Sequence, residues 1–487
     1  MFRSLLLLLL SLLLCGCGGG GGGSTSSQAE EAAGHRLQVR VNTGVINPQT
    51  IGPLSTITRV RVELLVFGTG SEYLPALEVP VDAANFSAVA VFSPVSQGRY
   101  TLRASGFNSM GTLVAGPITS DVDVAPGLSS AASLLLQVPP VEKDFLFVAA
   151  ADEIHVFESD PTTGVLTPNA SSPFAAPTGS RPDELVSGPD GRFLYSNFFS
   201  LNQIARYEID PATGSLTFLD TVPTGNVPSG MTVDPQKEFL YVPNRLDGTV
   251  GVFRVDQTTG ALTETPNSPF AVAGATNPQR AYTDPQGRFL FVTDFFLNGE
   301  LFVMKIDRTS GDLTQTVGPF QAFPVSPLPF RTFAVTTDPQ GTILYVSGNF
   351  PEIAVYDIDQ TTGFLTPRGN VPVASNNLGE LVFDDQRSVL YALGFSDDVI
   401  RTYQIDVNGD IGAEITGSPV LTGGIDPLTL LLTPDGTRLY IGNFQITGQT
   451  SAFLPDANGL PVPVTGQPFA SGFGPFGLEF LRLQSFP

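Results

Sequence analysis

Asp160-Pro-Thr-Thr-Gly164-Val-Leu166 is the first copy of a short pattern that this chain repeats seven times. In the later copies an Asp again precedes a Gly by three or four residues, and these copies begin at Asp210, Asp256, Asp307, Asp359, Asp406 and Asp456. The glycines of successive copies lie about 46 to 52 residues apart, a period that is typical of propellers and solenoids.

Each copy has the chemistry of a hairpin turn. The Asp side chain can accept a hydrogen bond from the backbone two residues on, and the Gly adopts φ > 0 without a Cβ clash. A second hairpin signal lies in each period, as in Pro-Asp-Gly-Arg-Phe-Leu-Tyr (189–195) and Asp-Pro-Gln-Gly-Arg-Phe-Leu-Phe (284–291). One period therefore predicts four short antiparallel strands, which is the composition of a propeller blade.

The two ends of the repeat region indicate how the ring closes. Phe145-Leu-Phe-Val148 matches the second strand of a blade, but no first strand precedes it. Residues 475–481 match a first strand, with nothing after it. We therefore expect the last strand to complete the first blade. The predicted fold is all-β, with a seven-bladed β-propeller over residues 141–485 that has no free sheet edge at its seam.

Three further segments precede the predicted propeller. Residues 1–17 have the basic start and the short leucine-rich run of an export signal, too short to span a bilayer of about 30 Å. Residues 18–35 are rich in Gly and Ser and predict a flexible tether. Residues 36–138 alternate apolar and polar side chains, which predicts a small β-sandwich similar to immunoglobulin- or transthyretin-like domains. That domain is either a spacer or a carbohydrate-contacting module.

The export signal ends in Leu14-Cys15-Gly16-Cys17, which resembles a bacterial lipobox. The resemblance implies that Cys17 is acylated and becomes the mature N-terminus, so the protein would meet the membrane through a lipid anchor. Gly19, two residues further on, resembles the pattern of outer-membrane sorting. We therefore expect a cell-envelope protein, anchored at the outer membrane or cell surface. An ordinary cleaved signal peptide is the alternative.

Charge and cysteine content exclude other classes of function. The net charge of −22 leaves no basic stripe that could meet phosphates, so nucleic acid is not an expected partner. The chain has two cysteines, both in the signal segment. The mature domains must therefore fold without disulfides, through core packing and backbone hydrogen bonds.

The repeats resemble the seven-bladed lactonase family, the 6-phosphogluconolactonase-like propellers, over about residues 141–485. The motifs that carry this resemblance are strand and turn residues rather than catalytic ones. Enzymes of that family usually carry histidines entering the first strand, whereas the matching segments here read Arg-Pro-Asp-Glu-Leu (181–185) and Asn-Pro-Gln-Arg-Ala (277–281). The chain has only His35 and His155, and we expect His155 to be structural, on the third strand of the first blade.

Other polar residues occupy the positions where those histidines would lie. By register they include Glu184, Arg280 and Glu380, and the first strand of a blade is the innermost, so we expect these side chains near one mouth of the central channel. A Glu with a raised pKa could activate water against a lactone carbonyl, and Arg280 could stabilise the oxyanion. Alternatively, these groups are rim charges that pair with each other. Arg245 and Arg331 could line the same face and bind a ligand.

Neither a metal nor an organic cofactor is predicted. Calcium held by Glu184, Glu380 and the side chains of Asn197 or Asn244 is an alternative, because six-bladed lactonases hold calcium in their channel.

The fold and the channel residues leave two functions open. The first is an anchored extracytoplasmic binding or scaffold protein for an unknown protein or small-molecule ligand. The second is a lactone hydrolase that uses Glu184, Glu380 and Arg280.

Overall fold

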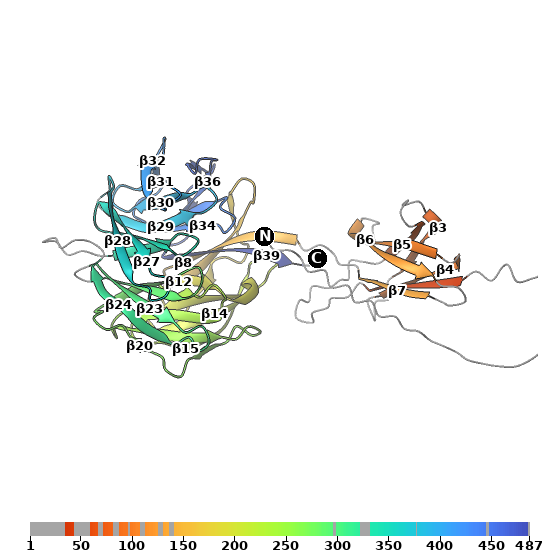
Figure 1. Cartoon of the computed structure of the whole chain (residues 1–487), viewed down its shortest axis with the longest axis horizontal. Coiled ribbons are helices and arrows are strands. Elements are labelled where there is room, and N and C mark those ends of the chain that lie inside the picture. Colours follow the sequence, from red (N-terminus) through yellow and green to blue (C-terminus); the bar gives the residue numbers. More distant parts are fainter. Residues whose placement is uncertain are drawn as a thin grey trace, which may run out of the picture. The chain divides into compact units, whose positions relative to one another are not determined.

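The computed structural model of the chain describes twelve stretches: residues 35–42, 59–66, 72–80, 87–95, 98–107, 113–124, 130–135, 141–295, 299–321, 332–375, 377–444 and 448–485. Within these stretches the regular secondary structure is almost entirely β-strand, and the chain divides into two compact units (Figure 1). One unit covers residues 143–483, and the other holds strands β1 to β7. The predicted signal, Cys17 and the tether up to residue 34 lie outside the described residues.

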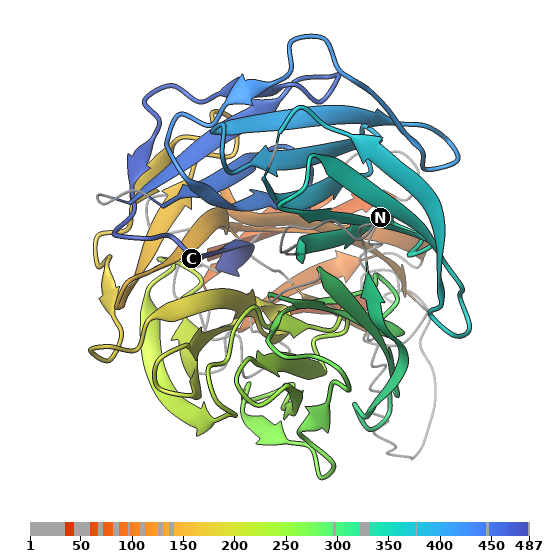
Figure 2. The ribbon, with the colours of Figure 1, turned by 90° about the vertical axis from the view of Figure 1, so that its left-hand side faces the viewer.

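The larger unit is a ring of seven sheets, each of which is one blade. Successive sheets follow one another around the ring in chain order (Figure 2). The first strands of neighbouring blades contact each other, as do β12 with β16 and β25 with β29, so they line the centre of the ring. This arrangement confirms the predicted seven-bladed propeller. The second strands of blades 2 to 7 are buried along their whole length, because each sheet packs both of its faces against neighbouring blades.

The blades take their strands from the chain in a regular order. Blade 1 contains β39 (Gly477–Ser485), β8 (Val141–Ala150), β9 (Glu153–Ser159) and β10 (Leu166–Pro168) with β11 (Phe174–Ala175), and blade 2 contains β12 (Pro182–Ser187), β13 (Phe193–Phe198), β14 (Gln203–Ile209) and β15 (Leu216–Pro223). Blade 3 contains β16 (Thr232–Val233), β17 (Phe239–Asn244), β18 (Thr249–Val255) and β19 (Leu262–Glu264) with β20 (Phe270–Ala271). Blade 4 contains β21 (Pro278–Thr283), β22 (Phe289–Asp294), β23 (Glu300–Ile306) and β24 (Leu313–Gln321).

The remaining blades repeat this order. Blade 5 contains β25 (Thr332–Thr337), β26 (Ile343–Gly348), β27 (Glu352–Ile358) and β28 (Leu365–Pro372). Blade 6 contains β29 (Leu378–Asp384), β30 (Val389–Gly394), β31 (Val399–Ile405) and β32 (Ile411–Glu414) with β33 (Val420–Leu421). Blade 7 contains β34 (Pro427–Leu432), β35 (Leu439–Asn443), β36 (Gln449–Pro455) and β37 (Pro461–Pro463) with β38 (Phe469–Ala470).

The outermost strand differs from the prediction of one continuous fourth strand. In blades 1, 3, 6 and 7 it is split into two short pieces that both pair with the third strand. A proline stands directly before each second piece, at Pro173, Pro269, Pro419 and Pro468. Proline has no N–H to donate to the ladder, which favours the interruption in these four blades, although β24 of blade 4 continues through Pro319 as one strand.

The last strand closes the ring as predicted. Strand β39 is hydrogen-bonded to β8 in the first blade, and the Phe476 N–H donates to the Ala149 carbonyl at 2.9 Å. Behind this seam, Asp144 on β8 accepts from two arginines. Arg438 of blade 7 is 1% exposed, and Arg482 on β39 donates through Nε at 2.7 Å. The seam is therefore held by charges as well as by sheet pairing. We call Asp144, Arg438 and Arg482 the closing cluster.

The repeated turns have the predicted chemistry. Asp160 accepts from the Thr162 and Thr163 N–H groups at 2.9 and 2.7 Å, and Gly164 has φ +68°. The turn glycine has a second role that the sequence did not reveal. A Cβ at Gly214 would lie 2.5 Å from the Phe145 ring on the second strand of the preceding blade. Each turn thus packs on its neighbour, which links the blades around the ring.

The smaller unit contains two sheets. One has the order β4-β1-β7 and the other the order β3-β2-β5-β6. Their strands are β1 (His35–Asn42), β2 (Arg59–Val66), β3 (Glu72–Pro80), β4 (Ser87–Val95), β5 (Gly98–Phe107), β6 (Leu113–Val124) and β7 (Ser130–Leu135). Val60, Val62 and Leu64 are fully buried, as the alternation predicts. The sandwich interpretation and its bounds at 36 and 138 stay predictions. In the described stretches no helix is long and apolar enough to cross a membrane.

Candidate functional site: one mouth of the channel

The inner strands bring the predicted polar residues together. Side chains of a strand alternate between its faces, so residues two apart on β12, β21 and β29 face the channel. Glu184, Arg280 and Glu380 line one cavity of about 300 Å³, to which Thr429 and Gly230 also contribute. The three charged residues come from blades 2, 4 and 6. The ring therefore assembles a site from positions about 100 residues apart in the chain.

Arg280 and Glu380 form an ion pair across the channel. Arg280 Nη1 donates to Glu380 Oε2, and their side chains are only 22% and 10% exposed. Tyr282 joins the pair, since its hydroxyl donates to Glu380 Oε1 at 3.3 Å and accepts from Arg280 Nη1 at 3.5 Å. Burial alone would lower the pKa of Arg280, but the Glu380 carboxylate raises it well above the ordinary value. The guanidinium therefore stays charged.

Glu184 lies beside this pair without joining it. Within the part of the chain that the structure describes, no cation forms an ion pair with its carboxylate. Burial raises the pKa of Glu184 to about 8, and the negative charges of Asp183 and Glu380 oppose its ionisation further, although Arg280 partly offsets them. A carboxyl group that exchanges its proton near neutral pH is suited to acid–base chemistry.

Two channel residues were missed by the sequence reasoning. Tyr282 and Glu479 also line the cavity. Tyr282 lies two positions beyond Arg280 on the same strand, so the period of two along the first strand could have found it. Burial raises the pKa of Glu479, which accepts a hydrogen bond from the Ser187 N–H at 3.0 Å. Burial likewise raises the pKa of Tyr282, so its hydroxyl remains protonated.

Asn197 and Asn244, the predicted ligand residues, are buried and bonded to groups of the protein itself. Asn197 is fully buried at the end of β13, where its Oδ1 accepts from the Glu184 N–H at 2.9 Å and its Nδ2 donates to the Pro228 carbonyl at 2.8 Å. Asn244 is 1% exposed and bonds Thr224 and Thr249. Buried amides satisfy nearby polar groups first. Asn197 thus positions the backbone of Glu184 and does not face a ligand. Arg331 lies outside the described residues.

Arg245 belongs to a ring of side chains around this mouth. In five blades the residue just after the second strand donates its N–H to a carbonyl near the start of the first strand, at 2.8 to 3.2 Å. These residues are Phe199, Arg245, Phe295, Phe395 and Phe444. The Arg245 guanidinium lies 5.6 Å from the Phe199 ring centre and 5.1 Å from that of Phe295. Burial lowers the pKa of Arg245. Together these five side chains form a half-buried and mainly aromatic rim at the channel mouth.

A second cavity lies between this rim and the ion pair. Its volume is about 310 Å³, and we call it the vestibule. Its walls are Phe295, Phe333, Phe395 and Leu428, together with Gln279, Asn377, Gly379, Arg280 and Glu380. Because Arg280 and Glu380 also line the channel cavity, the two spaces adjoin at the ion pair.

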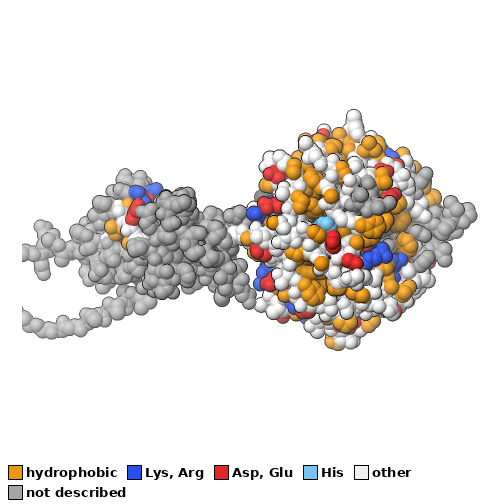
Figure 3. All heavy atoms as spheres, turned by 180° about the vertical axis from the view of Figure 1, so that it is seen from behind, with side chains coloured by type: hydrophobic (Ala, Val, Ile, Leu, Met, Phe, Trp, Pro, Cys, Tyr) orange, Lys and Arg blue, Asp and Glu red, His pale blue; other side chains and the backbone are white. Residues whose placement is uncertain are grey.

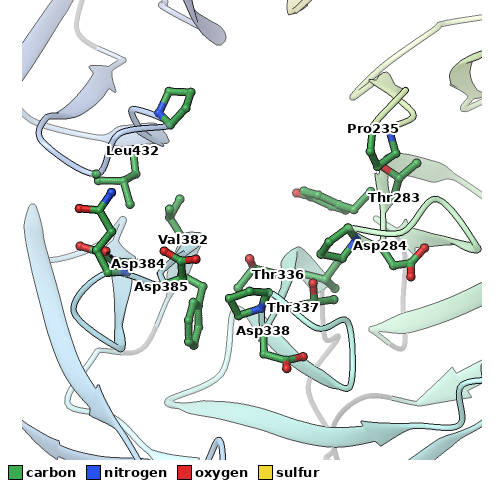
Figure 4. A pocket seen from close by; sticks show the side chains of 18 of the residues that line it. Pro235, Thr283, Asp284, Thr336, Thr337, Asp338, Val382, Asp384, Asp385 and Leu432 are labelled. Atoms are coloured by element: carbon green, nitrogen blue, oxygen red, sulfur yellow. Dashed lines mark hydrogen bonds between the residues drawn. The ribbon is translucent and has the colours of Figure 1, made fainter. Parts of the chain in front are cut away.

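The opposite mouth of the channel has a larger cavity, about 470 Å³, at the far ends of the inner strands (Figure 4). Two of its acidic residues are engaged in turns. Asp284 accepts from the Phe289 N–H at 2.9 Å, and Asp338 accepts from the Ile343 N–H at 2.7 Å. These carboxylates hold the hairpins between the first and second strands, so they have a structural role that Glu184 does not share.

Three of the residues named for the calcium alternative have partners within the protein. In the described residues no three His, Cys, Asp or Glu side chains come together in a geometry that could hold a metal ion. The proposed ligands Asn197 and Asn244 are committed to other contacts, and Glu380 is bonded to Arg280.

His155 lies on β9, the third strand of blade 1, where its Nε2 is 3.2 Å from Glu153 Oε2. The surface in Figure 3 mixes hydrophobic side chains with charges of both signs.

Comparison with known proteins agrees with the repeats and the ring. Residues 145–277 match the family described as lactonase, 7-bladed beta-propeller. Over these residues the propeller is similar to this lactonase family. No curated protein matches the sequence.

Several solved structures share the fold of this propeller. A candidate 6-phosphogluconolactonase from Bacteroides fragilis has a TM-score of 0.57 at 22% identity, over 70% of this chain and 98% of that one. The periplasmic gluconolactonase of Pseudomonas aeruginosa has a TM-score of 0.56 at 18% identity, over 70% and 100%. A protein of Lactobacillus plantarum has a TM-score of 0.57 at 19% identity, over 70% and 100%. At these identities the likeness shows the fold alone.

Proposed function

We propose that this protein hydrolyses a lactone at the rimmed mouth of its channel, with Glu184 as the general base. The observation that supports this most is a carboxyl group with a pKa of about 8, placed beside a fixed guanidinium in a cavity of about 300 Å³. The match of residues 145–277 to the lactonase family and the fold shared with a gluconolactonase support the same class of reaction.

The chain's own residues supply each part of this reaction. The Glu184 carboxylate takes a proton from a water molecule, whose oxygen attacks the lactone carbonyl carbon. Negative charge then develops on the carbonyl oxygen, where the Arg280 guanidinium stabilises it. The ring C–O bond breaks, and protonated Glu184 returns the proton to the leaving alkoxide. Glu380 and Tyr282 hold Arg280 in place, as positioning residues.

The second candidate is binding without turnover, as in an anchored binding or scaffold protein. The observation that favours it is the engagement of Arg280 by Glu380 and Tyr282 without substrate. The family histidines are also missing from the first strands. In this function the same cavity would hold a small polar ligand, and Glu184 would be a ligand-facing group.

Assays on the purified full chain separate the two functions. Glucono-1,5-lactone and 6-phosphogluconolactone are tested with and without Ca²⁺. For a hydrolase, kcat/KM rises with pH up to about 8, because the base must be deprotonated. Glu184→Gln and Arg280→Ala then lower kcat by about 10²- to 10⁴-fold. Arg206→Ala is the control, since Arg206 pairs with the half-exposed Asp220. Turnover that survives Glu184→Gln contradicts the mechanism, and no turnover on either lactone favours binding.

We also propose that the protein is exported and held in the cell envelope by a lipid on Cys17. The lipobox-like sequence before Cys17 supports this. Cys17→Ser should release the chain from membranes, because the remaining chain would have lost its acyl groups. Fractionation of cells that express each form checks the prediction, with Cys15→Ser as the matched control. Retention of the Cys17→Ser variant in the membrane fraction contradicts it.

A further inference from the structure

The vestibule has the features of a sugar-binding subsite. Three phenyl rings from different blades, Phe295, Phe333 and Phe395, form its apolar walls, and all three are half-buried. Small-molecule sites are commonly lined by aromatic side chains with a few placed polar groups. The C–H face of a sugar ring packs well against such a phenyl surface.

Two polar atoms in the vestibule have no partner among the described residues. Gln279 Oε1 and Asn377 Oδ1 are buried and accept no hydrogen bond there. A buried acceptor without a donor costs about 1–3 kcal/mol. Both residues line the vestibule. Hydroxyl groups on a bound ligand would supply the missing donors.

The same atoms exclude an anionic group from the vestibule. The unpartnered groups are carbonyl oxygens, and the charge that lines the vestibule besides Arg280 is the Glu380 carboxylate. Arg280 already donates to Glu380 and Tyr282. A phosphate or carboxylate placed here would therefore face acceptors, whereas a neutral ring with hydroxyl donors would satisfy them.

We infer that the vestibule binds a second, neutral sugar ring, so that the site takes the lactone of a disaccharide aldonic acid rather than that of a free monosaccharide. The channel cavity of about 300 Å³ would hold the lactone ring beside Glu184, and the adjoining vestibule of about 310 Å³ would hold its glycosidic substituent. Each volume is at the lower end for small-molecule pockets, and together they fit two rings. The inference rests on the proposed function for the reacting ring alone.

Binding of the open-chain acids tests the inference without hydrolysis. Calorimetry on the full chain compares cellobionate, which carries a second glucose ring, with gluconate, which does not. We expect cellobionate to bind at least about tenfold more tightly. Asn377→Leu, which replaces the carboxamide by an apolar group of similar size, should reduce this preference to within about threefold, and so should Phe395→Ala. Phe218→Ala, a half-exposed ring on β15, should leave it unchanged.

The outcomes separate this inference from the proposed function. Equal affinities for the two acids, no binding of either, or a preference that survives both vestibule variants would overturn the subsite. A cellobionate preference in a protein that hydrolyses neither glucono-1,5-lactone nor cellobiono-1,5-lactone supports the subsite and contradicts only the hydrolase. The melting temperature of each variant shows whether it is folded. If Phe395→Ala does not fold, the test rests on Asn377→Leu.

Discussion

The closing cluster and the channel site use the same chemical groups in opposite ways. In the closing cluster, Asp144 accepts from Arg438 and Arg482, with a contact of 2.7 Å from Arg482 Nε. In the channel, Arg280 pairs with Glu380, but Glu184 beside it has no ion pair among the described residues. Burial alone would raise the pKa of Asp144, yet the bonds from Arg482 and Arg438 lower it. The pKa of Glu184 rises to about 8.

This difference separates a structural cluster from a functional one. A buried charge that is fully paired and hydrogen-bonded holds two elements together, and removing one partner is costly. A buried carboxyl group that is left uncompensated destabilises the fold and persists where it has another use. The closing cluster joins strands at the seam, whereas Glu184 faces a cavity. Three variants and one titration test this contrast.

The largest effect is expected at the seam. Asp144→Asn removes the buried negative charge that the two arginines share, and it leaves Arg438 with a contact of 3.5 Å to Asp435 in place of its closest partner. We expect the free energy of unfolding to fall by about 3–5 kcal/mol, measured by urea denaturation of the full chain. Asp220→Asn, which breaks the half-exposed pair with Arg206, is the control and should cost about 1 kcal/mol or less. Equal losses for the two variants would show that the closing cluster does not hold the ring.

An ordinary blade junction should be less sensitive than the seam. Gly214→Val combines φ strain, at φ +72°, with a collision with the Phe145 ring. We expect a loss of about 2–4 kcal/mol from these two causes. Gly179 has a similar φ of +76°, but a Cβ added there would meet no atom within 4 Å, so Gly179→Val reports the strain alone, about 1–2 kcal/mol. Thermal and urea unfolding measure the stability of both variants. If Gly214→Val and Gly179→Val lose the same free energy of unfolding, the contact between blades has no energetic role.

The channel site should respond in the opposite direction. The folded-state pKa of Glu184 is about 8, above the ordinary 4.5, so both states are protonated below pH 4.5. As pH rises to about 8 the unfolded chain releases a proton that the folded chain keeps, and the wild type loses stability. Glu184→Gln avoids this loss. We expect it to be more stable than the wild type by about 1–3 kcal/mol at pH 9, and equal to it at pH 4.

Urea denaturation at both pH values checks this prediction. Glu158→Gln is the control, because Glu158 is half-exposed and pairs with Lys143 at the surface. A Glu184→Gln variant that is less stable than the wild type at pH 9 would mean that the carboxylate is compensated after all, and the contrast with the closing cluster would be lost.

The sequence predicts the ring well because its determinants are local and repeated. Each Asp-to-Gly turn and each Asp-Pro hairpin is formed within a few residues, and the unmatched segments at 145–148 and 475–481 indicate the closing pair. The register of the inner strands also brings Glu184, Arg280 and Glu380 to one cavity. These inferences require only the period of two along a strand and the order of strands in a blade.

The remaining features depend on contacts between blades, which local pattern does not encode. Asn197 is a candidate calcium ligand in the sequence, but its amide satisfies two backbone groups in a buried position. The closing cluster joins residues 294 and 338 positions apart in the chain. The split of the outer strand coincides with prolines such as Pro173, but β24 continues through Pro319, so the proline alone does not predict the split.

The most direct test is the titration of Glu184 itself. Potentiometric titration of the wild-type full chain, minus that of Glu184→Gln, gives the proton that this one carboxyl group binds. We predict a single proton released with a midpoint near pH 8, because burial beside Asp183 and Glu380 disfavours the charged form. A midpoint near 4.5 would contradict the account, since Glu184 would then be an ordinary solvated carboxylate at the channel wall.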